Sequence, residues 1–233
     1  MGTPDFAVPP LAALVQNGYE VTAVVTQPDK PKGRGKTLLP TPVKEEAMKH
    51  DIPVYQPLKV REPEFVETLK KLEPDMIIVA AFGQIIPKTI LDMPKYGCLN
   101  IHASLLPKYR GAAPIQWAVL NGDKITGVTT MYLASEMDTG DIIYTTETEI
   151  GDFETSGELF DRLMIMGAEL LDRTLRDIEA GTAPRTPQDH SKASYVKMLD
   201  KSLSPIEWAK TPREVIKQIY GLQPWPVATA ELD

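Results

Sequence analysis

The sequence predicts an α/β fold, in which helices cover both faces of a doubly wound, mostly parallel sheet. Short runs typical of β-strands alternate with helical runs along the chain, as they do in such sheets. Residues 76–81 read MIIVAA, a continuous apolar run that indicates a central strand buried on both faces. The length of 233 residues fits one domain of ordinary size with part of a second.

The first half of the chain predicts three helices and three strands. Apolar periodicity places helices over residues 6–17, 43–50 and 63–72, and strands over residues 20–26, 54–55 and 76–81. The first helix is expected to end at Gly18, because glycine readily adopts the left-handed conformation that follows many helices. Residues 27–40 are polar and contain prolines, so they predict a long loop.

The second half predicts strands over residues 98–102, 127–133 and 142–149, with a helix over residues 114–121. Thr155 and Glu158 have the spacing of a capping box, in which each side chain binds the backbone N–H of the other residue. The long helix that they open is expected to end at Gly181.

A change of composition after Gly181 divides the chain. Residues 1–181 are expected to form the main domain, the polar residues 182–200 a linker, and residues 201–233 the beginning of a truncated second domain. In that second part, Thr211 and Glu214 form another capping box, and alternation over residues 227–232 predicts a strand. Residues 2–5 suit a turn that leaves a strand, so we expect a first strand of the main domain to be missing.

The bulk composition excludes several classes of protein. No run of about 18 apolar residues occurs, which argues against a membrane-spanning helix, and the first residues lack the pattern of a secretory signal. The single cysteine, Cys98, excludes an internal disulfide and a cysteine-cluster zinc site. We therefore expect a cytoplasmic monomer without a metal ion.

One short segment is strongly basic although the whole chain carries a net charge of −7. Residues 30–36 read KPKGRGK, with four cations and no acid. A solvated surface loop is the simplest interpretation of such a run. The alternative is a functional loop, because Gly33 and Gly35 make the backbone around Arg34 adaptable, and a flexible cationic loop can settle onto phosphates after encounter.

Two polar side chains share one face of the strand predicted over residues 98–102. Side chains at alternate positions of a strand point the same way, so Asn100 and His102 face one side while Leu99 and Ile101 face the core. Open α/β sheets bind ligands at the carboxyl ends of their strands. The pair therefore indicates a binding or catalytic site, with a merely structural polar pair as the alternative.

These residue types suit acyl transfer. Such a reaction needs a hydrogen-bond donor for the developing oxyanion and a group that exchanges protons near neutral pH. Asn100 offers the first and His102 the second, while Asp138, in a loop between two predicted strands, can orient the imidazole or simply form a turn. Ser104 lacks the glycine-flanked elbow of serine hydrolases, and Cys98 has no evident activating partner, so we expect direct attack by an amine.

At this point the sequence resembles a known family. Residues 100–107 (NIHASLLP), followed by DTG at residues 138–140, are similar to the signature of the folate-dependent formyltransferases. Three further motifs resemble the branch that acts on methionyl-tRNA: GTPDF at residues 2–6, QPD with GRGK at residues 27–36, and RGAAPIQ at residues 110–116. The resemblance covers essentially the whole chain.

The resemblance implies a function and a set of site residues. It implies a Rossmann-like catalytic domain followed by an OB-like β-barrel, and formyl transfer from 10-formyltetrahydrofolate, as co-substrate, to initiator methionyl-tRNA for translation initiation. The residues that match the family's catalytic trio are Asn100, His102 and Asp138. Those that would border the folate are Ser104, Leu105, Leu106 and Pro107, and those expected at the tRNA or its methionine are Arg34, Lys36 and Phe6.

Two alternatives remain open from the sequence. The amine acceptor can instead be a nucleotide-sugar or a purine precursor, because the chemistry at the formyl group is the same. The chain can also be an inactive module that binds folate or RNA, since both of its ends look incomplete. Residues 27–40 are the segment expected to discriminate between acceptors.

Overall fold

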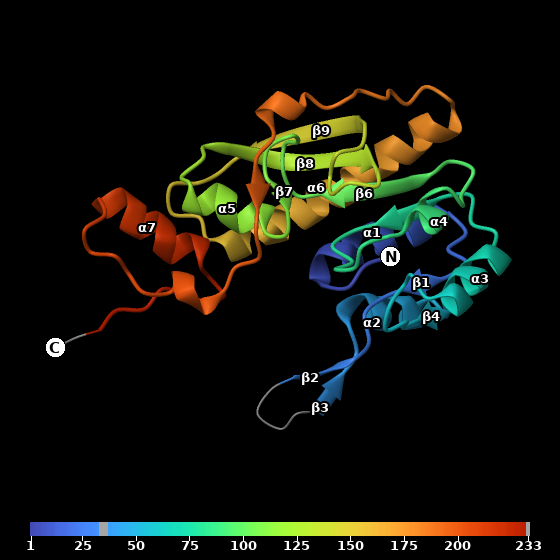
Figure 1. Cartoon of the computed structure of the whole chain (residues 1–233), viewed down its shortest axis with the longest axis horizontal. Helices are drawn as coiled ribbons and strands as arrows, with labels where there is room; N and C mark the ends of the chain where they lie inside the picture. The colour runs from blue at the N-terminus through green and yellow to red at the C-terminus, as the bar shows by residue number, and fades with distance from the viewer. Residues whose placement is uncertain (33–36, 232–233) are drawn as a thin grey trace.

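The structure is a computed structural model that describes residues 1–32 and 37–231. Its centre is a four-stranded sheet in the order β5-β6-β8-β9 (Figure 1). The bounds of these strands are Ile77–Val79, Cys98–His102, Ile125–Tyr132 and Ile142–Glu149. β5 and β6 are parallel, whereas β8 and β9 join them antiparallel. A second parallel pair consists of β1 (Val24–Val25) and β4 (Val54–Tyr55). The predicted α/β fold is confirmed.

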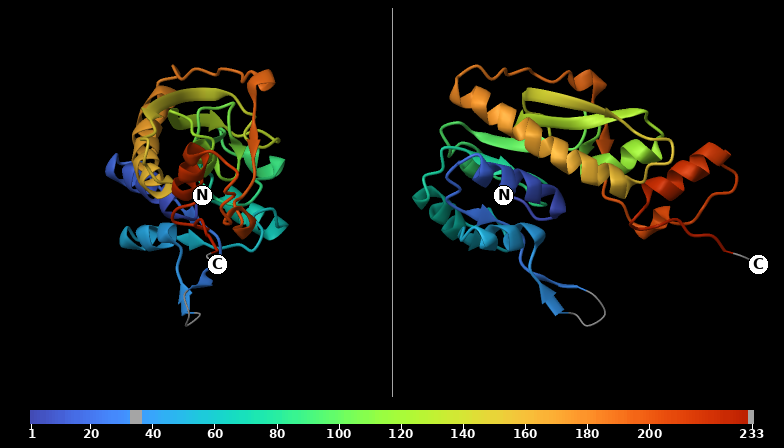
Figure 2. Two further views of the ribbon diagram at one scale, coloured as in Figure 1. Left: turned by 90° about the vertical axis from the view of Figure 1, so that its left-hand side faces the viewer. Right: turned by 180° about the vertical axis from the view of Figure 1, so that it is seen from behind.

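The long helix α6 (Ser156–Glu179) runs along one face of this sheet, beside α1 (Val8–Gln16) (Figure 2). The predicted capping box is present at its start, with Thr155 and Glu158 each accepting a backbone hydrogen bond from the other. Gly181 follows its end with a φ of 70°, the left-handed conformation expected at a helix terminus.

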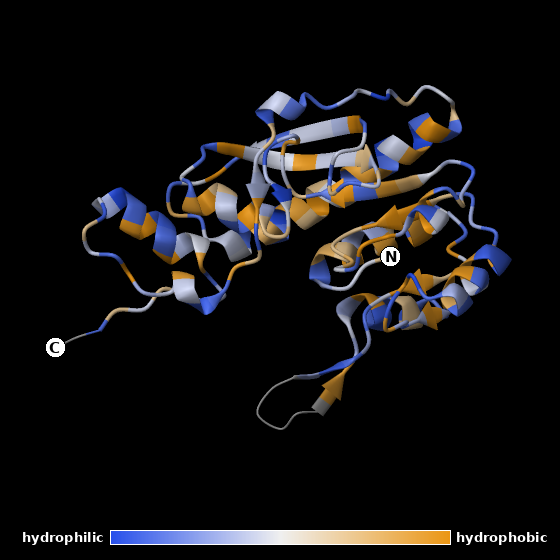
Figure 3. Ribbon diagram, viewed as in Figure 1, coloured by the Kyte–Doolittle hydropathy of each residue, from blue (hydrophilic) through white to orange (hydrophobic). Residues whose placement is uncertain are grey.

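The two faces of the sheet build two apolar cores. Leu99 and Ile101 pack in the core that includes α6, while Cys98 packs in a second core on the opposite face. This second core is closed by α3 (Pro63–Lys71) and α4 (Lys88–Leu91). Figure 3 shows β9 as largely polar, as expected for the edge strand of a sheet with one face exposed to solvent.

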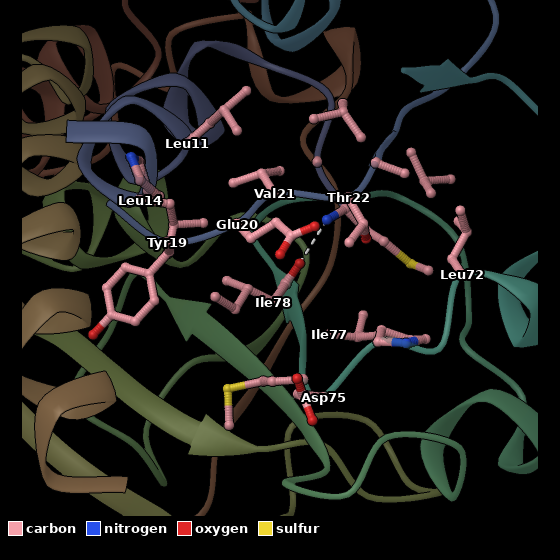
Figure 4. A pocket seen from close by; sticks show the side chains of 18 of the residues that line it. Leu11, Leu14, Tyr19, Glu20, Val21, Thr22, Leu72, Asp75, Ile77 and Ile78 are labelled. Atoms are coloured by element: carbon pink, nitrogen blue, oxygen red, sulfur yellow. Dashed lines mark hydrogen bonds between the residues drawn. The ribbon is translucent and has the colours of Figure 1, made fainter. Parts of the chain in front are cut away.

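The strand predicted over residues 20–26 is much shorter in the structure, where only Val24–Val25 form β1. Met1 and Gly2 lie between β1 and β5, since Gly2 N donates to Val25 O at 3.0 Å and Ala80 N donates to Met1 O at 2.9 Å. Next to them lies a cavity of about 690 Å³ whose lining includes Val21 and Ile78 (Figure 4). Residues 20–23 line this cavity, and among the described residues no strand lies beside them on that side. A strand requires hydrogen bonds to a neighbouring strand, so β1 begins only at Val24.

The long loop predicted over residues 27–40 is wrong in part. β2 (Lys30–Lys32) and β3 (Thr37–Leu39) form an antiparallel hairpin that projects from the body of the molecule (Figure 1). Asp29 anchors its base, because its carboxylate accepts 2.6 Å hydrogen bonds from Lys44 Nζ and Gln56 Nε2. These two donors hold the pKa of Asp29 below its usual value. The sequence did not predict β2 and β3, because these strands are short and proline residues are rare within strands.

The C-terminal part packs against the main domain through a helix pair. α7 (Pro212–Gly221) contacts α5 (Pro114–Leu120), and its predicted capping box is present. Within residues 227–231, the described part of the strand predicted over residues 227–232, one bridge joins Thr229 to Pro205. The backbone hydrogen bonds there run from Ile206 N to Thr229 O and from Thr229 N to Ser204 O. The predicted beginning of a β-barrel is therefore not confirmed. No helix within the described ranges is long and apolar enough to cross a membrane.

Candidate active site

β6 carries the two polar side chains that the sequence placed on one face. The strand runs over Cys98–His102 as predicted, and Asn100 and His102 lie opposite Met131 and Thr129 of β8. Their exposed fractions are 8 % and 6 %. Because Leu99 and Ile101 pack in the core beside α6, Asn100 and His102 lie on the other face of the sheet, at and near its carboxyl end.

Each ring nitrogen of His102 lies near an acceptor. Nε2 is 2.9 Å from the carbonyl oxygen of Tyr109, and Nδ1 is 3.8 Å from Oδ2 of Asp138. A carbonyl oxygen can only accept, so Nε2 carries the proton in this hydrogen bond. Nδ1 is then the nitrogen that can take up a further proton, and the adjacent carboxylate would stabilise the resulting imidazolium.

Asp138 is held in a tight turn between β8 and β9. Its backbone has a φ of 53°, and its Oδ2 accepts a 2.8 Å hydrogen bond from Gly111 N. Gly140 lies so close to β8 that a Cβ atom there would stand 1.9 Å from the carbonyl oxygen of Tyr132. This close approach requires glycine. The structure thus brings the loop carboxylate to the imidazole, as the sequence predicted.

The loop over residues 104–107 begins one residue after the end of β6 and is fixed by Thr129, a residue that no local sequence pattern indicates. Thr129 Oγ1 donates to Ser104 O at 2.6 Å and accepts from Leu106 N at 3.2 Å. Ser104 Oγ in turn donates to Lys108 O at 2.6 Å, so this hydroxyl is engaged. The role of Thr129 could be inferred only from the pairing of the strands, because Thr129 of β8 lies opposite His102 of β6.

Tyr109 is a second residue that the sequence analysis did not identify. Its carbonyl binds His102, while its phenol donates to Asp123 Oδ2 at 2.7 Å and accepts from Asn121 Nδ2 at 3.0 Å. Burial raises the pKa of Tyr109 to about 12. The phenol therefore serves as a neutral anchor for the backbone that orients the imidazole.

Other sequence-predicted site residues lie away from the trio or outside the described part of the chain. Phe6 is 3 % exposed and packs edge-to-face against Phe160, with ring centroids 5.7 Å apart. Core packing accounts for this position, and its contact with methionine stays a prediction. Arg34 and Lys36 lie outside the described residues.

Cys98 lies at the opposite end of β6 from His102. Burial raises the pKa of its thiol to about 12, and its Sγ lies 3.6 Å from Ile90 O. A nucleophilic cysteine must instead be accessible and readily ionised. Cys98 is therefore a core residue, which agrees with the expectation that the chain offers no covalent nucleophile at the site. Among the residues that the structure describes, no group of three His, Cys, Asp or Glu side chains could hold a metal ion.

Comparison with known proteins identifies the family. The model of a family described as formyl transferase matches residues 1–175. The methionyl-tRNA formyltransferase of Acetivibrio thermocellus is 56 % identical over 228 residues, which cover 98 % of this chain and 73 % of the relative. The chain belongs to the methionyl-tRNA formyltransferase family. The member from Clostridioides difficile is 55 % identical over 98 % of this chain and 74 % of its own length.

Solved structures agree with this family's fold. WlaRD, a sugar 3N-formyl transferase crystallised with dTDP and 5-N-formyl-THF, has a TM-score of 0.72 at 23 % identity. The comparison covers 94 % of this methionyl-tRNA formyltransferase family member and 76 % of WlaRD. HypX from Aquifex aeolicus in complex with tetrahydrofolic acid has a TM-score of 0.65 at 23 % identity, over 80 % of this chain and 32 % of HypX. At such identities the likeness concerns the fold.

Proposed function

We propose that the chain transfers the formyl group of 10-formyltetrahydrofolate to the α-amine of initiator methionyl-tRNA. One observation carries this proposal: the side chain of His102 stands 3.8 Å from the carboxylate of Asp138 at the end of the strand that also presents Asn100. An amide donor, an imidazole and a carboxylate are the groups that acyl transfer to an amine requires.

In the proposed mechanism the amine nitrogen attacks the formyl carbon and the new C–N bond forms. The carbonyl electron pair moves onto oxygen, where the amide N–H of Asn100 stabilises the oxyanion. Nδ1 of His102 accepts the proton that the attacking amine loses, and Asp138 stabilises the imidazolium. When the tetrahedral intermediate collapses, the bond to the folate nitrogen breaks and that nitrogen receives the proton from His102.

The finer assignments are part of the same proposal. Folate borders the loop formed by Ser104, Leu105, Leu106 and Pro107, which begins one residue after the end of β6. Arg34 and Lys36 contact the tRNA backbone. This role is supported by their place in the sequence between β2 and β3, two strands that project together from the body (Figure 1). Residues 1–181 act as the catalytic domain and residues 201–233 begin a second domain. The monomeric, cytoplasmic state stays a prediction.

Transfer of a labelled formyl group tests the proposal. The chain is incubated with 10-formyltetrahydrofolate labelled in the formyl carbon and with methionyl-tRNA, a dTDP-linked amino sugar or no acceptor. We expect label on methionyl-tRNA alone, and none with the His102→Ala variant. Label on the amino sugar alone would identify a sugar formyltransferase, and folate binding without transfer to either acceptor would identify a binding module.

A further inference from the structure

Arg110 is a buried cation that forms no ion pair with a carboxylate among the residues that the structure describes. It is 1 % exposed, and its guanidinium donates to Oε1 of Gln188 from Nε at 3.1 Å and from Nη2 at 2.6 Å. Nη1 donates to the Tyr195 hydroxyl at 2.9 Å, and Nη2 lies 3.1 Å from His190 Nδ1. All of these partners belong to the segment 182–200, which the sequence predicted to be a linker.

Gln188 connects this cation to the loop of Asp138. A guanidinium can only donate, so the oxygen of the Gln188 amide must face Arg110 and its nitrogen must face the other way. That nitrogen, Nε2, donates to the carbonyl oxygens of Asp138 at 2.9 Å and of Gly140 at 2.8 Å. The side chain is 6 % exposed, so both ends of the amide are bound and water has little access to either.

The same segment also fixes the other neighbour of the His102 ring. Ser194 Oγ accepts from Tyr109 N at 2.9 Å, and Ser194 O accepts from Arg110 N at 2.8 Å. Beyond it, β10 (Tyr195–Val196) pairs in parallel with β7 (Arg110–Gly111). The loop of Tyr109 and the loop of Asp138, which flank the His102 ring, are therefore both hydrogen-bonded to the segment 182–200.

Asp138 has particular need of such support. A φ of 53° lies in the left-handed region, which costs a non-glycine residue free energy and persists only when the surroundings hold it. On one side its carboxylate is bound to Gly111 N, and on the other its carbonyl is bound to Gln188. Without the second contact, the turn has one fewer restraint on the direction in which the carboxylate points.

We propose that Gln188, oriented by the buried charge of Arg110, is a positioning residue that holds Asp138 against His102. The segment 182–200 is then a structural part of the active site and not a passive connection. This inference rests on the proposed function, because it assigns Gln188 an effect that passes through Asp138.

Two substitutions separate positioning from stability. Gln188→Glu keeps an acceptor for Arg110, but it replaces the N–H groups that bind the loop carbonyls with a carboxylate oxygen, which can only accept and repels those carbonyls. Gln188→Met removes both contacts. We expect kcat to fall by about 10- to 100-fold in both variants, as displacement of a catalytic group by about 1 Å does, with KM for each substrate within about threefold. The matched control is Gln218→Glu, because the buried Gln218 amide likewise donates to two backbone carbonyl oxygens, those of Leu203 and Pro205, but outside the site; this variant should retain kcat.

A double-mutant cycle with Asp138→Asn decides the route of the effect. If Gln188 acts through the carboxylate of Asp138, Gln188→Glu should lower kcat in the wild-type chain but cost little more in the Asp138→Asn background. Equal losses in both backgrounds, or a normal kcat for Gln188→Glu with an unchanged melting temperature, would overturn the inference. Failure of the wild-type chain to transfer formyl at all would instead contradict the proposed function.

Discussion

Replacing Asp138 with asparagine removes one negative charge from beside His102 and changes little else. Asparagine has nearly the same shape, can accept the hydrogen bond that Gly111 N donates at 2.8 Å, and tolerates the left-handed φ of 53° at this position. The variant should therefore fold with a melting temperature close to that of the wild-type chain. Any loss of rate then reports on the charge.

The separation of the two groups gives the size of the effect. Two unit charges 3.8 Å apart interact by about 4 kcal/mol at an effective dielectric constant of about 20. Both side chains are largely buried, at 7 % and 12 % exposed, so salt screens this interaction only weakly. If the imidazolium forms in the transition state, losing the whole interaction corresponds to about 10³ in rate, and partial compensation by the asparagine dipole lowers this to about 10².

The assay is steady-state formyl transfer at saturating 10-formyltetrahydrofolate and methionyl-tRNA. We expect kcat of Asp138→Asn to fall by about 10²–10³ while both KM values stay within about threefold, because the carboxylate acts on the charge that develops during reaction. A kcat within threefold of wild type, in a variant with an unchanged melting temperature, would show that the Asp138 carboxylate does not stabilise an imidazolium at His102 in the transition state.

Three further predictions test separate parts of the structure. Because burial raises the pKa of Cys98 to about 12, iodoacetamide at pH 8 should modify the native chain far more slowly than the urea-unfolded chain. Raising the pH from 8 toward 10 should accelerate modification of the native chain. Equal rates in both states at pH 8 would contradict the burial of Cys98. Gly140→Ala would set a Cβ 1.9 Å from Tyr132 O, so it should lower both the melting temperature and kcat. The control Gly18→Ala meets nothing within 4 Å and should cost about 1–2 kcal/mol of stability for its positive φ while kcat is retained. Arg34→Ala should weaken tRNA binding and reduce the slope of log affinity against log salt concentration by about 1, with folate affinity unchanged. An unaltered slope would show that residues 30–36 do not contact the tRNA phosphates.

The strand of the candidate site was predictable because its signal is local. Leu99 and Ile101 alternate with Asn100 and His102, and strand geometry alone turns this pattern into one apolar and one polar face. The two capping boxes are local as well, since each depends on residues three positions apart. The structure confirms the strand to its last residue and both boxes.

Features that depend on a distant partner were missed. Nothing in residues 182–200 signals that Gln188 reaches the loop of Asp138, because the contact exists only once the segment packs beside β7. Residues 20–26 and 227–232 have the composition of strands. In the part of these ranges that the structure describes, only Val24–Val25 form a strand and only Thr229 forms a bridge. β-Propensity describes how well a side chain fits into a sheet. Residues with high β-propensity therefore do not form a strand where the sheet is interrupted.

In the proposed mechanism, Asn100, His102 and Asp138 act together on one formyl group. Single-turnover transfer by Asn100→Ala is the sharpest test of this cooperation, because the substitution removes the oxyanion donor without changing any charge. We expect a rate lower by about 10²–10³, with the affinity for 10-formyltetrahydrofolate measured separately and unchanged within about threefold. A rate within threefold of wild type at equal folate occupancy would contradict it.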